Sequence, residues 1–394
     1  MLTALLAARP RITPSLLRRK LHFVSSPVPA QCRPKEFTKL ANRSQTQSLR
    51  FTNTFSRTSV RCMSGSNKRM APAKIGTHDG SFHCDEALGC FLLQNTKAYA
   101  DAEIVRSRDP ETLAGCDVVI DVGATYEPSK NRFDHHQKGF EEIFGHGFVT
   151  KLSSAGLVYK HFGREIVANV LKWESTDPRV EKIYLKMYKA FIEAVDANDN
   201  GVNQFDTEAP SKYEVNTSLP SRVGKLNPAW NETFDAESQN SQFRKAMQVT
   251  GAEFVDALKY YGESWMLART HVVEAMDDVK STHPSGEILK LPCYCPWKEH
   301  LFELEAERKT EPLPKYALYE DDKGAWRIQA IPLTPSSFEN RKPLPKDWRG
   351  VRDADLDAVS GISGGIFVHA AGFIGGNKTY EGALAMAAKA LEID

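Results

Sequence analysis

The sequence of 394 residues has no run of 18 or more apolar residues, so it lacks a stretch of the length that a membrane-spanning helix needs. It shows no secretory signal and no internal repeats, and its seven cysteines are an odd number in a long chain. A framework of disulfide bonds is therefore not expected. The overall composition, with 41% hydrophobic and 26% charged residues, is that of an ordinary globular protein without a membrane partner.

Acidic residues are nearly absent from the first 62 residues, which contain twelve Lys or Arg and only Glu36 as an acid. An Arg-rich, Ser-rich and acid-poor leader is typical of a disordered organellar transit peptide. The alternative is a disordered basic arm that binds nucleic acid. Translation that starts at Met63 or Met70 would remove the leader. We therefore expect a protein that is imported into an organelle, with a second form that lacks the leader if either start is used.

Over the rest of the chain, basic residues are fewer than acidic residues, and the net charge is −10. A broad basic face for long nucleic acids is therefore not expected, because affinity for phosphates depends on Lys and Arg. This charge is compatible with a local groove that grips a few nucleotides at the end of a strand.

The order of the apolar segments predicts an α/β fold. Short strands at 74–77 and 102–106, and the buried strand 117–122, alternate with helices at 84–95, 153–173 and 179–196, as expected for a parallel sheet. We predict three parts beyond the leader: a metal-binding domain at 72–235, a long connecting helix at 236–283, and a smaller mixed α+β domain at 284–394. The last part contains the predicted hairpin 316–331 and ends in an Ala-rich helix at 380–391.

Four short segments carry residues that could bind metal. They are the stretch from His78 to Glu86, Asp121, the triplet from Asp134 to His136, and the stretch from Asp196 to Gly201. Each has an ordinary structural interpretation on its own, as a helix cap or a polar turn. Together they place carboxylates and imidazoles where strands end, which is where open α/β sheets have their sites. Imidazoles beside carboxylates favour Mn²⁺, with Mg²⁺, Co²⁺ or Zn²⁺ as alternatives.

The order of these segments is similar to that of the DHH phosphoesterase superfamily, although His83 stands where that superfamily has its first Asp. Five motifs resemble the Myg family (melanocyte proliferating gene family) more closely. These motifs are THDGSFHCDEALG, VVIDVG, RFDHHQKGF, EAVDANDNG and GIFVHAAGFIGGNKTYEGALAMA, and the resemblance extends from residue 74 to 394. It implies a DHH-like phosphoesterase fold and a 3′–5′ exonuclease activity on single-stranded RNA ends, with mitochondrial and nuclear locations.

The resemblance also implies roles for individual residues. It assigns one metal to His78, His83 and Asp121, and a second to Asp85, Asp121, His135 and Asp196, so that Asp121 bridges the two ions. His136 would contact the scissile phosphate or protonate the leaving group. Asp134 would orient an imidazole or, equally, form a turn.

The Gly-rich segment 360–379 is the predicted substrate clamp, with His369, Gly375, Gly376 and Lys378 as its contacts. Tight packing of a strand and a helix is the alternative interpretation of the same glycines. Arg222 is a further candidate for a phosphate contact.

Two other functions remain open at the level of sequence. One is a small-molecule phosphodiesterase or pyrophosphatase that uses the same site, and the other is a degenerate phosphoesterase that acts as a binding scaffold. The sequence does not determine the oligomeric state.

Overall fold

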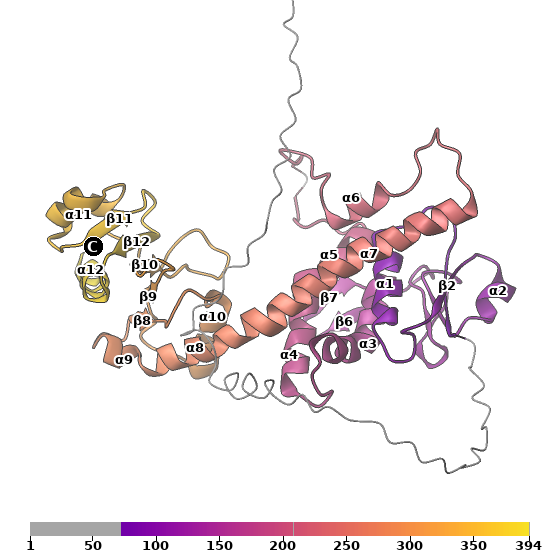
Figure 1. The fold of residues 1–394 in the computed structure, drawn as a ribbon, viewed down its shortest axis with the longest axis horizontal. Helices are drawn as coiled ribbons and strands as arrows, with labels where there is room; N and C mark the ends of the chain where they lie inside the picture. Colours follow the sequence, from indigo (N-terminus) through magenta and orange to yellow (C-terminus); the bar gives the residue numbers. More distant parts are fainter. Residues whose placement is uncertain (1–71, 208, 394) are drawn as a thin grey trace, which may run out of the picture.

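The computed structural model describes residues 72–207 and 209–393, which form two bodies joined by a long helical connector (Figure 1). The predicted transit peptide, Met63 and Met70 lie outside the described residues. The predicted α/β character is confirmed, with a mainly parallel sheet in the first body and a second sheet in the C-terminal body.

The first sheet has the strand order β2-β1-β3-β5-β4. Its strands are β1 (Lys74–Thr77), β2 (Glu103–Arg106), β3 (Val118–Ile120), β4 (Tyr126–Glu127) and β5 (Arg132–Phe133). The strands β2, β1, β3 and β5 run parallel, and β4 is the antiparallel edge. Because β3 is buried along its whole length, its continuous apolar sequence fits an inner strand of such a sheet. A separate hairpin, β6 (Ile143–Gly145) and β7 (Phe148–Lys151), precedes the main helices.

Helices cover this sheet and form most of the first core. They are α1 (Cys84–Gln94), α2 (Pro110–Ala114), α3 (Ser154–Leu171), α4 (Pro178–Met187), α5 (Glu193–Asp199) and α6 (Leu219–Gly224). A π-helical segment (Tyr188–Ile192) joins α4 to α5, so that one continuous helical stretch runs over 178–199. The helix α1 lies against both α3 and α7 (Ala236–Tyr260). The approach of α7 to α1 requires Gly251, because a side chain there would overlap the ring of Phe91.

The predicted connecting helix is present, but it is not a free spacer. It comprises α7, a π-helical segment (Tyr261–Trp265), α8 (Met266–Asp277) and the short α9 (Val279–Thr282). Phe243 and Phe254 of α7 belong to the first core, whereas Ala268 and Val272 of α8 belong to the core of the second body. The connector therefore contributes side chains to the cores of both bodies.

The second body is built on a mixed sheet with the order β11-β12-β10-β9-β8. Its elements are β8 (Ile288–Lys290), α10 (Lys298–Arg308), β9 (Tyr316–Glu320), β10 (Trp326–Ala330), α11 (Asp353–Ser360), β11 (Gly365–Val368), β12 (Ile374–Asn377) and α12 (Tyr380–Glu392). The predicted hairpin is β9 and β10, and the predicted final helix is α12. The apolar side chains of α12 pack on one face of the sheet, and those of α8 and α10 pack on the other.

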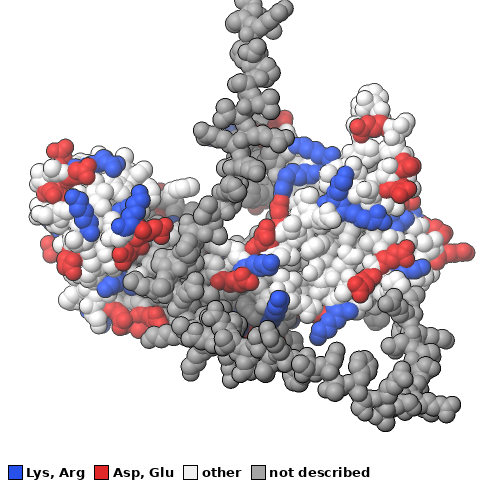
Figure 2. Space-filling model, in the orientation of Figure 1, with Lys and Arg blue, Asp and Glu red and all other residues white. Residues whose placement is uncertain are grey.

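Within the described residues, none of the helices combines the length and the apolar character needed to cross a membrane. Figure 2 shows Lys and Arg interspersed with Asp and Glu on the visible face, with short groups of basic side chains over the body that carries α6. No continuous basic face appears in this view.

Candidate metal centre

Three adjacent parallel strands end at the candidate site. His78 follows β1, Asp121 follows β3, and the triplet that begins with Asp134 follows β5, and β3 lies between the other two strands. The carboxyl ends of parallel strands share one edge of a sheet, so these side chains converge although they are far apart in the sequence. The structure therefore brings three of the four predicted segments together at strand ends.

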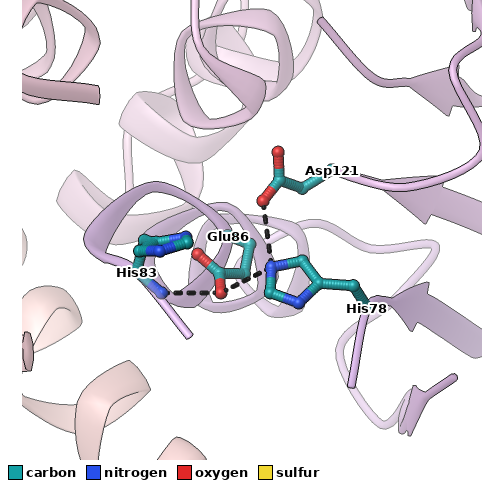
Figure 3. Close-up of side chains that lie close together, drawn as sticks. All are labelled: His78, His83, Glu86 and Asp121. Atoms are coloured by element: carbon teal, nitrogen blue, oxygen red, sulfur yellow. Dashed lines mark hydrogen bonds and ion pairs between the residues drawn. The ribbon is translucent and has the colours of Figure 1, made fainter. Parts of the chain in front are cut away.

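His78 lies at the centre of the first group of side chains (Figure 3). Its Nδ1 is 2.9 Å from the carbonyl oxygen of Asp79, which makes Nδ1 the donor and directs Nε2 into the site. Nε2 is 3.0 Å from Glu86 Oε1 and 3.3 Å from Asp121 Oδ2. The ring of His83 joins these residues to complete a group of four that could hold a cation. A backbone carbonyl that fixes the tautomer of an imidazole is common where that imidazole binds metal.

Asp121 occupies an unusual backbone conformation, with a φ of 58°. A residue with a side chain seldom adopts the left-handed region, and such strain is often found at functional sites. The conformation turns the carboxylate so that its two oxygens face different groups. Oδ2 faces His78, whereas Oδ1 lies 3.4 Å from His135 Nε2. A carboxylate shared in this way has the geometry of a bridging ligand.

A second group of side chains surrounds His135. Its Nε2 is 3.2 Å from Asp199 Oδ2, and Asp85 completes a set of three that could hold a cation. The ring of His136 also approaches Asp121, with its Nδ1 3.6 Å from Oδ1. Asp121, His135 and His136 form a third such set, so Asp121 links the group around His78 to the group around His135.

Asp134 fixes the orientation of His136. Its Oδ1 accepts hydrogen bonds from the backbone N–H of His136 at 3.1 Å and from His136 Nδ1 at 2.7 Å. Its Oδ2 accepts from the N–H of Ala124 at 2.6 Å, so the same carboxylate also closes the turn after β3. Both interpretations of Asp134, as an orienting group and as a turn former, hold at once. The side chain of His136 is 60% exposed, which leaves its ring accessible beside the cluster.

The structure places Asp199, and not the predicted Asp196, in the second group of ligands. Asp196 is completely buried, and its Oδ1 accepts from the N–H and the hydroxyl of Ser153, at 3.0 and 2.7 Å. Its Oδ2 accepts from the hydroxyl of Tyr188 at 3.1 Å. Gly156 allows this close approach, because a side chain there would overlap the carboxylate. Asp196 therefore joins α5 to α3 and holds the helical turn that presents Asp199.

Several buried polar atoms at the site have no hydrogen-bond partner among the residues that the structure describes. They are both carboxylate oxygens of Asp85, Glu86 Oε2 and His135 Nδ1. A buried polar atom left without a partner costs about 1–3 kcal/mol. Unpaired carboxylate oxygens and imidazoles at one place are a donor set that suits a divalent ion of the Mn²⁺ type.

The pKa shifts at the site also indicate a site for a cation. Burial and the neighbouring carboxylates of Asp121 and Asp199 raise the pKa of Asp85 well above its usual range. Burial by itself would lower the pKa of His78, but hydrogen bonds to Asp121 and Glu86 outweigh it and raise the pKa to about 10. Protons on the imidazoles thus offset crowded carboxylates. A bound cation would take over this role and release the protons.

Besides Asp199, two residues that contribute to the site were given no individual role from the sequence. Glu86 has the position of a helix-capping residue, and its Oε1 does accept from the N–H of His83 at 2.7 Å. The same oxygen also faces His78, which the capping pattern does not reveal. Arg106 at the end of β2 donates to the carbonyl oxygens of Gly80 and His78, at 2.7 and 3.2 Å. It therefore holds the loop that carries the first ligands.

The predicted substrate clamp does not reach the metal centre in this structure. Gly375 and Gly376 are inside β12, paired with Ile328 and Arg327 of β10, and Figure 1 shows this sheet at the opposite end of the connector from α1. A side chain at Gly375 would press on Leu344 at 3.0 Å, so close packing accounts for this glycine. His369 and Lys378 flank the strands of the same sheet. They are therefore also remote from α1.

Arg222 lies in the first body, on α6, where it forms an ion pair with Glu253 of α7. The segment that follows α6 is anchored beside the first ligands, because the amide of Asn227 bonds to both the N–H and the carbonyl of Phe82, at 3.0 and 2.8 Å. Arg222 is thus near α1 but engaged with a carboxylate.

The fold and the cluster together define an α/β protein with a candidate metal centre at the carboxyl edge of its parallel sheet. A family model described as "Uncharacterised protein family (UPF0160)", with the short name MYG1_exonuc, matches residues 74–391. The chain belongs to this family, which confirms the resemblance inferred from its motifs.

Curated relatives agree with this assignment. The chain is 50% identical to "MYG1 exonuclease" of Mus musculus over 82% of this chain and 85% of the relative. It is 48% identical to "MYG1 protein" of Dictyostelium discoideum over 82% and 97%. A crystal structure of an uncharacterised protein from Helicobacter pylori G27 matches with 12% identity and a TM-score of 0.22, over 78% of this chain and 94% of that one. This last likeness is too weak to bear on the fold.

Proposed function

We propose that this protein is a metal-dependent nuclease that removes nucleotides from the 3′ ends of single-stranded RNA. The observation that carries the proposal is the position of Asp121, whose two carboxylate oxygens face His78 and His135 in two separate ligand groups. The names of two mammalian relatives, both called MYG1 exonuclease, support this class of hydrolase. The RNA substrate and the 3′–5′ direction rest on the family resemblance.

The residues of the site fit two divalent ions, and Mn²⁺ suits their mixture of imidazoles and carboxylates. His78, His83, Glu86 and Asp121 would hold one ion. Asp85, Asp121, His135 and Asp199 would hold the other. When bound, the pair supplies an activated water and neutralises charge on the phosphoryl oxygens.

His136 is the protein group best placed to act on the substrate. It is exposed beside Asp121, and Asp134 holds its Nδ1, so its Nε2 faces away from that carboxylate. From there it would contact a phosphoryl oxygen or donate a proton to the departing sugar oxygen. The Asp134 carboxylate holds the ring in this orientation through its contact with Nδ1.

The test is hydrolysis by the purified chain, with and without the first 62 residues. RNA labelled at either end, DNA, a dinucleotide and pyrophosphate are each incubated with Mn²⁺ and with a chelator. We expect Mn²⁺-dependent release of mononucleotides from RNA 3′ ends, which is lost in Asp121→Asn and His135→Ala. His271→Ala, a substitution on α8, is the matched control and should retain activity.

Other outcomes would support other functions. Hydrolysis confined to pyrophosphate or the dinucleotide would indicate a small-molecule enzyme instead. Bound metal without hydrolysis of any substrate would support a binding scaffold. Equal activity in the wild type and the two site variants would refute the site assignment.

We also propose that the chain is imported into mitochondria and that a shorter form is made from Met63 or Met70. The Arg-rich, acid-poor composition of the first 62 residues supports this proposal. Immunoblotting of fractionated cells tests it. A single full-length species in one compartment would contradict it.

A further inference from the structure

An aromatic pocket lies where the connector meets the second body, and the proposed metal chemistry does not use it. The pocket has a volume of about 390 Å³, within the range of about 300–1,000 Å³ that is usual for small-molecule sites. Its walls come from α4, from the end of α7 with the π-helical segment 261–265, and from residues 294–299. The residues used below are Lys186, Tyr260, Tyr261, Trp265, Tyr294 and Glu299.

Aromatic rings make up the floor and the rim of this pocket. Trp265 is only 7% exposed and lies 5.9 Å from the ring of Tyr261. Two other rings are left open to solvent at the rim, since Tyr260 is 49% exposed and Tyr294 is 69% exposed. Open aromatic rings are suited to stacking on a flat ligand. The π-helical segment supports this interpretation, because such segments inside α-helices occur often at functional sites.

The charged groups of the pocket indicate which part of a nucleotide would bind. Lys186 lies over the rings of Tyr261 and Trp265, at 4.9 and 4.8 Å. Its ammonium is also paired with the carboxylate of Glu299 at 2.6 Å. Glu299 accepts from the indole N–H of Trp265 at 2.9 Å as well. Lys186 and Glu299 neutralise each other, which leaves Lys298 as the remaining charged residue of the lining. The aromatic rings therefore dominate the pocket, and they favour a base over a phosphate.

The pocket is well separated from the candidate metal centre. Lys186 and Asp199 belong to one continuous helical stretch. Their separation of 13 residues corresponds to roughly 20 Å at about 1.5 Å per residue. A ligand in the pocket would therefore be a base several nucleotides away from the bond that is cut.

We infer that this pocket binds a base of single-stranded nucleic acid by stacking, at a distance from the metal centre. The inference rests on the proposed nuclease function and adds a second contact with the same substrate. Stacking on aromatic rings accepts every base, since each base has a π-face. The pocket would therefore increase affinity for longer strands without selecting their sequence.

The experiment compares Tyr294→Ala, Tyr260→Ala and the double variant with Tyr213→Ala in the full-length chain. Tyr213 is the matched control, because it is 76% exposed and lies outside the pocket. Binding of a labelled single-stranded RNA of about 12 nucleotides is followed by fluorescence anisotropy in chelator, where no cleavage is expected. Hydrolysis of the same RNA and of a dinucleotide is then measured with Mn²⁺.

We expect each pocket variant to bind the long RNA about 5- to 150-fold more weakly, as the loss of one stacked base predicts. Its KM for the long RNA should rise, whereas hydrolysis of the dinucleotide should stay unchanged. Tyr294→Trp should bind the long RNA as tightly as the wild type, because it keeps an aromatic ring at this position. A merely structural role would instead reduce the hydrolysis of both substrates.

Failure of the inference and failure of the proposed function give different results. Wild-type cleavage of RNA with unchanged affinity in all pocket variants would overturn the inference alone. A wild type that binds RNA through Tyr294 but cleaves nothing would overturn the nuclease function alone. Wild-type protein that neither binds nor cleaves the strand would overturn both.

Discussion

Replacement of Asp199 and of Asp196 by Asn separates the ligand from the residue that supports it. Asp199 belongs to a crowded group of acids, where burial and the charge of Asp121 raise its pKa although His135 acts in the opposite sense. Removal of its charge relieves this repulsion. We therefore expect Asp199→Asn to leave the metal-free protein at least as stable as the wild type, and to weaken the bound metal.

The expected loss of metal can be given a magnitude. Removal of a group that only orients a ligand weakens metal binding about 10- to 100-fold. Asp199 is proposed as a ligand itself, so we expect its replacement to raise the Kd for the metal by about 100-fold, the upper end of this range. Metal at 100 times its Kd stabilises the wild type by about 2.7 kcal/mol. At the same concentration, the variant would be stabilised by only about 0.4 kcal/mol. The assay is unfolding in chelator and in Mn²⁺, together with RNA hydrolysis.

Asp196 should show the opposite behaviour. In Asp196→Asn the amide oxygen can still accept from Ser153, so metal binding and activity should largely persist. In Asp196→Ala the N–H and hydroxyl of Ser153 and the hydroxyl of Tyr188 lose their acceptor. Unsatisfied buried donors cost about 1–3 kcal/mol each, so the metal-free protein should lose at least about 3 kcal/mol. Loss of metal-induced stabilisation in Asp196→Asn, with retention in Asp199→Asn, would refute this assignment of ligands.

Three further predictions concern the support of the site. Gly156→Ala should lower the free energy of unfolding by about 1–3 kcal/mol, because the added methyl group would overpack against Asp196. Gly224→Ala is the control and should have little effect, because a side chain at Gly224 would meet open space. In chelator, the free energy of unfolding should fall as the pH rises from 6.5 to about 10, because the folded protein keeps a proton on His78 that the unfolded chain releases. In unfolding titrations, His78→Gln should remove this dependence of the unfolding free energy on pH. An unchanged dependence would contradict the assignment. Arg106→Lys should weaken Mn²⁺ binding about 10- to 100-fold in calorimetry, because one ammonium cannot replace the two guanidinium hydrogen bonds that hold the ligand loop.

The sequence was sufficient to predict the elements that bring the ligands together. Because β3 is buried along its whole length, its sequence is a nearly uninterrupted apolar run. Polar residues that directly follow such a strand, as they also follow β1 and β5, are easy to recognise in the sequence. Because parallel strands end at one edge, the segments could be grouped without knowing any distance. His78, His135 and Asp121 were assigned from this reasoning together with the family resemblance.

The choice between Asp196 and Asp199 could not be made from the sequence. The two residues are three positions apart on one helix, so both lie near the same face. The π-helical segment at 188–192 precedes them, and the extra residue that a π-turn accommodates rotates the following helix relative to regular spacing. Gly156 allows α3 to approach α5 closely at Asp196. This close approach determines that Asp196 packs against α3 and that Asp199 faces the metal centre.

The net charge and the two candidate sites together indicate how an acidic protein could hold a polyanion. The chain beyond its leader carries a charge of −10, so binding cannot depend on many phosphate contacts. Divalent ions at the strand ends would provide positive charge at the one phosphate that reacts. The aromatic pocket would add affinity through bases, which carry no charge, and Glu299 keeps Lys186 from acting as a phosphate contact. Affinity built in this way releases few counterions, so it should depend only weakly on salt. It should also grow with strand length until the pocket is occupied and then level off.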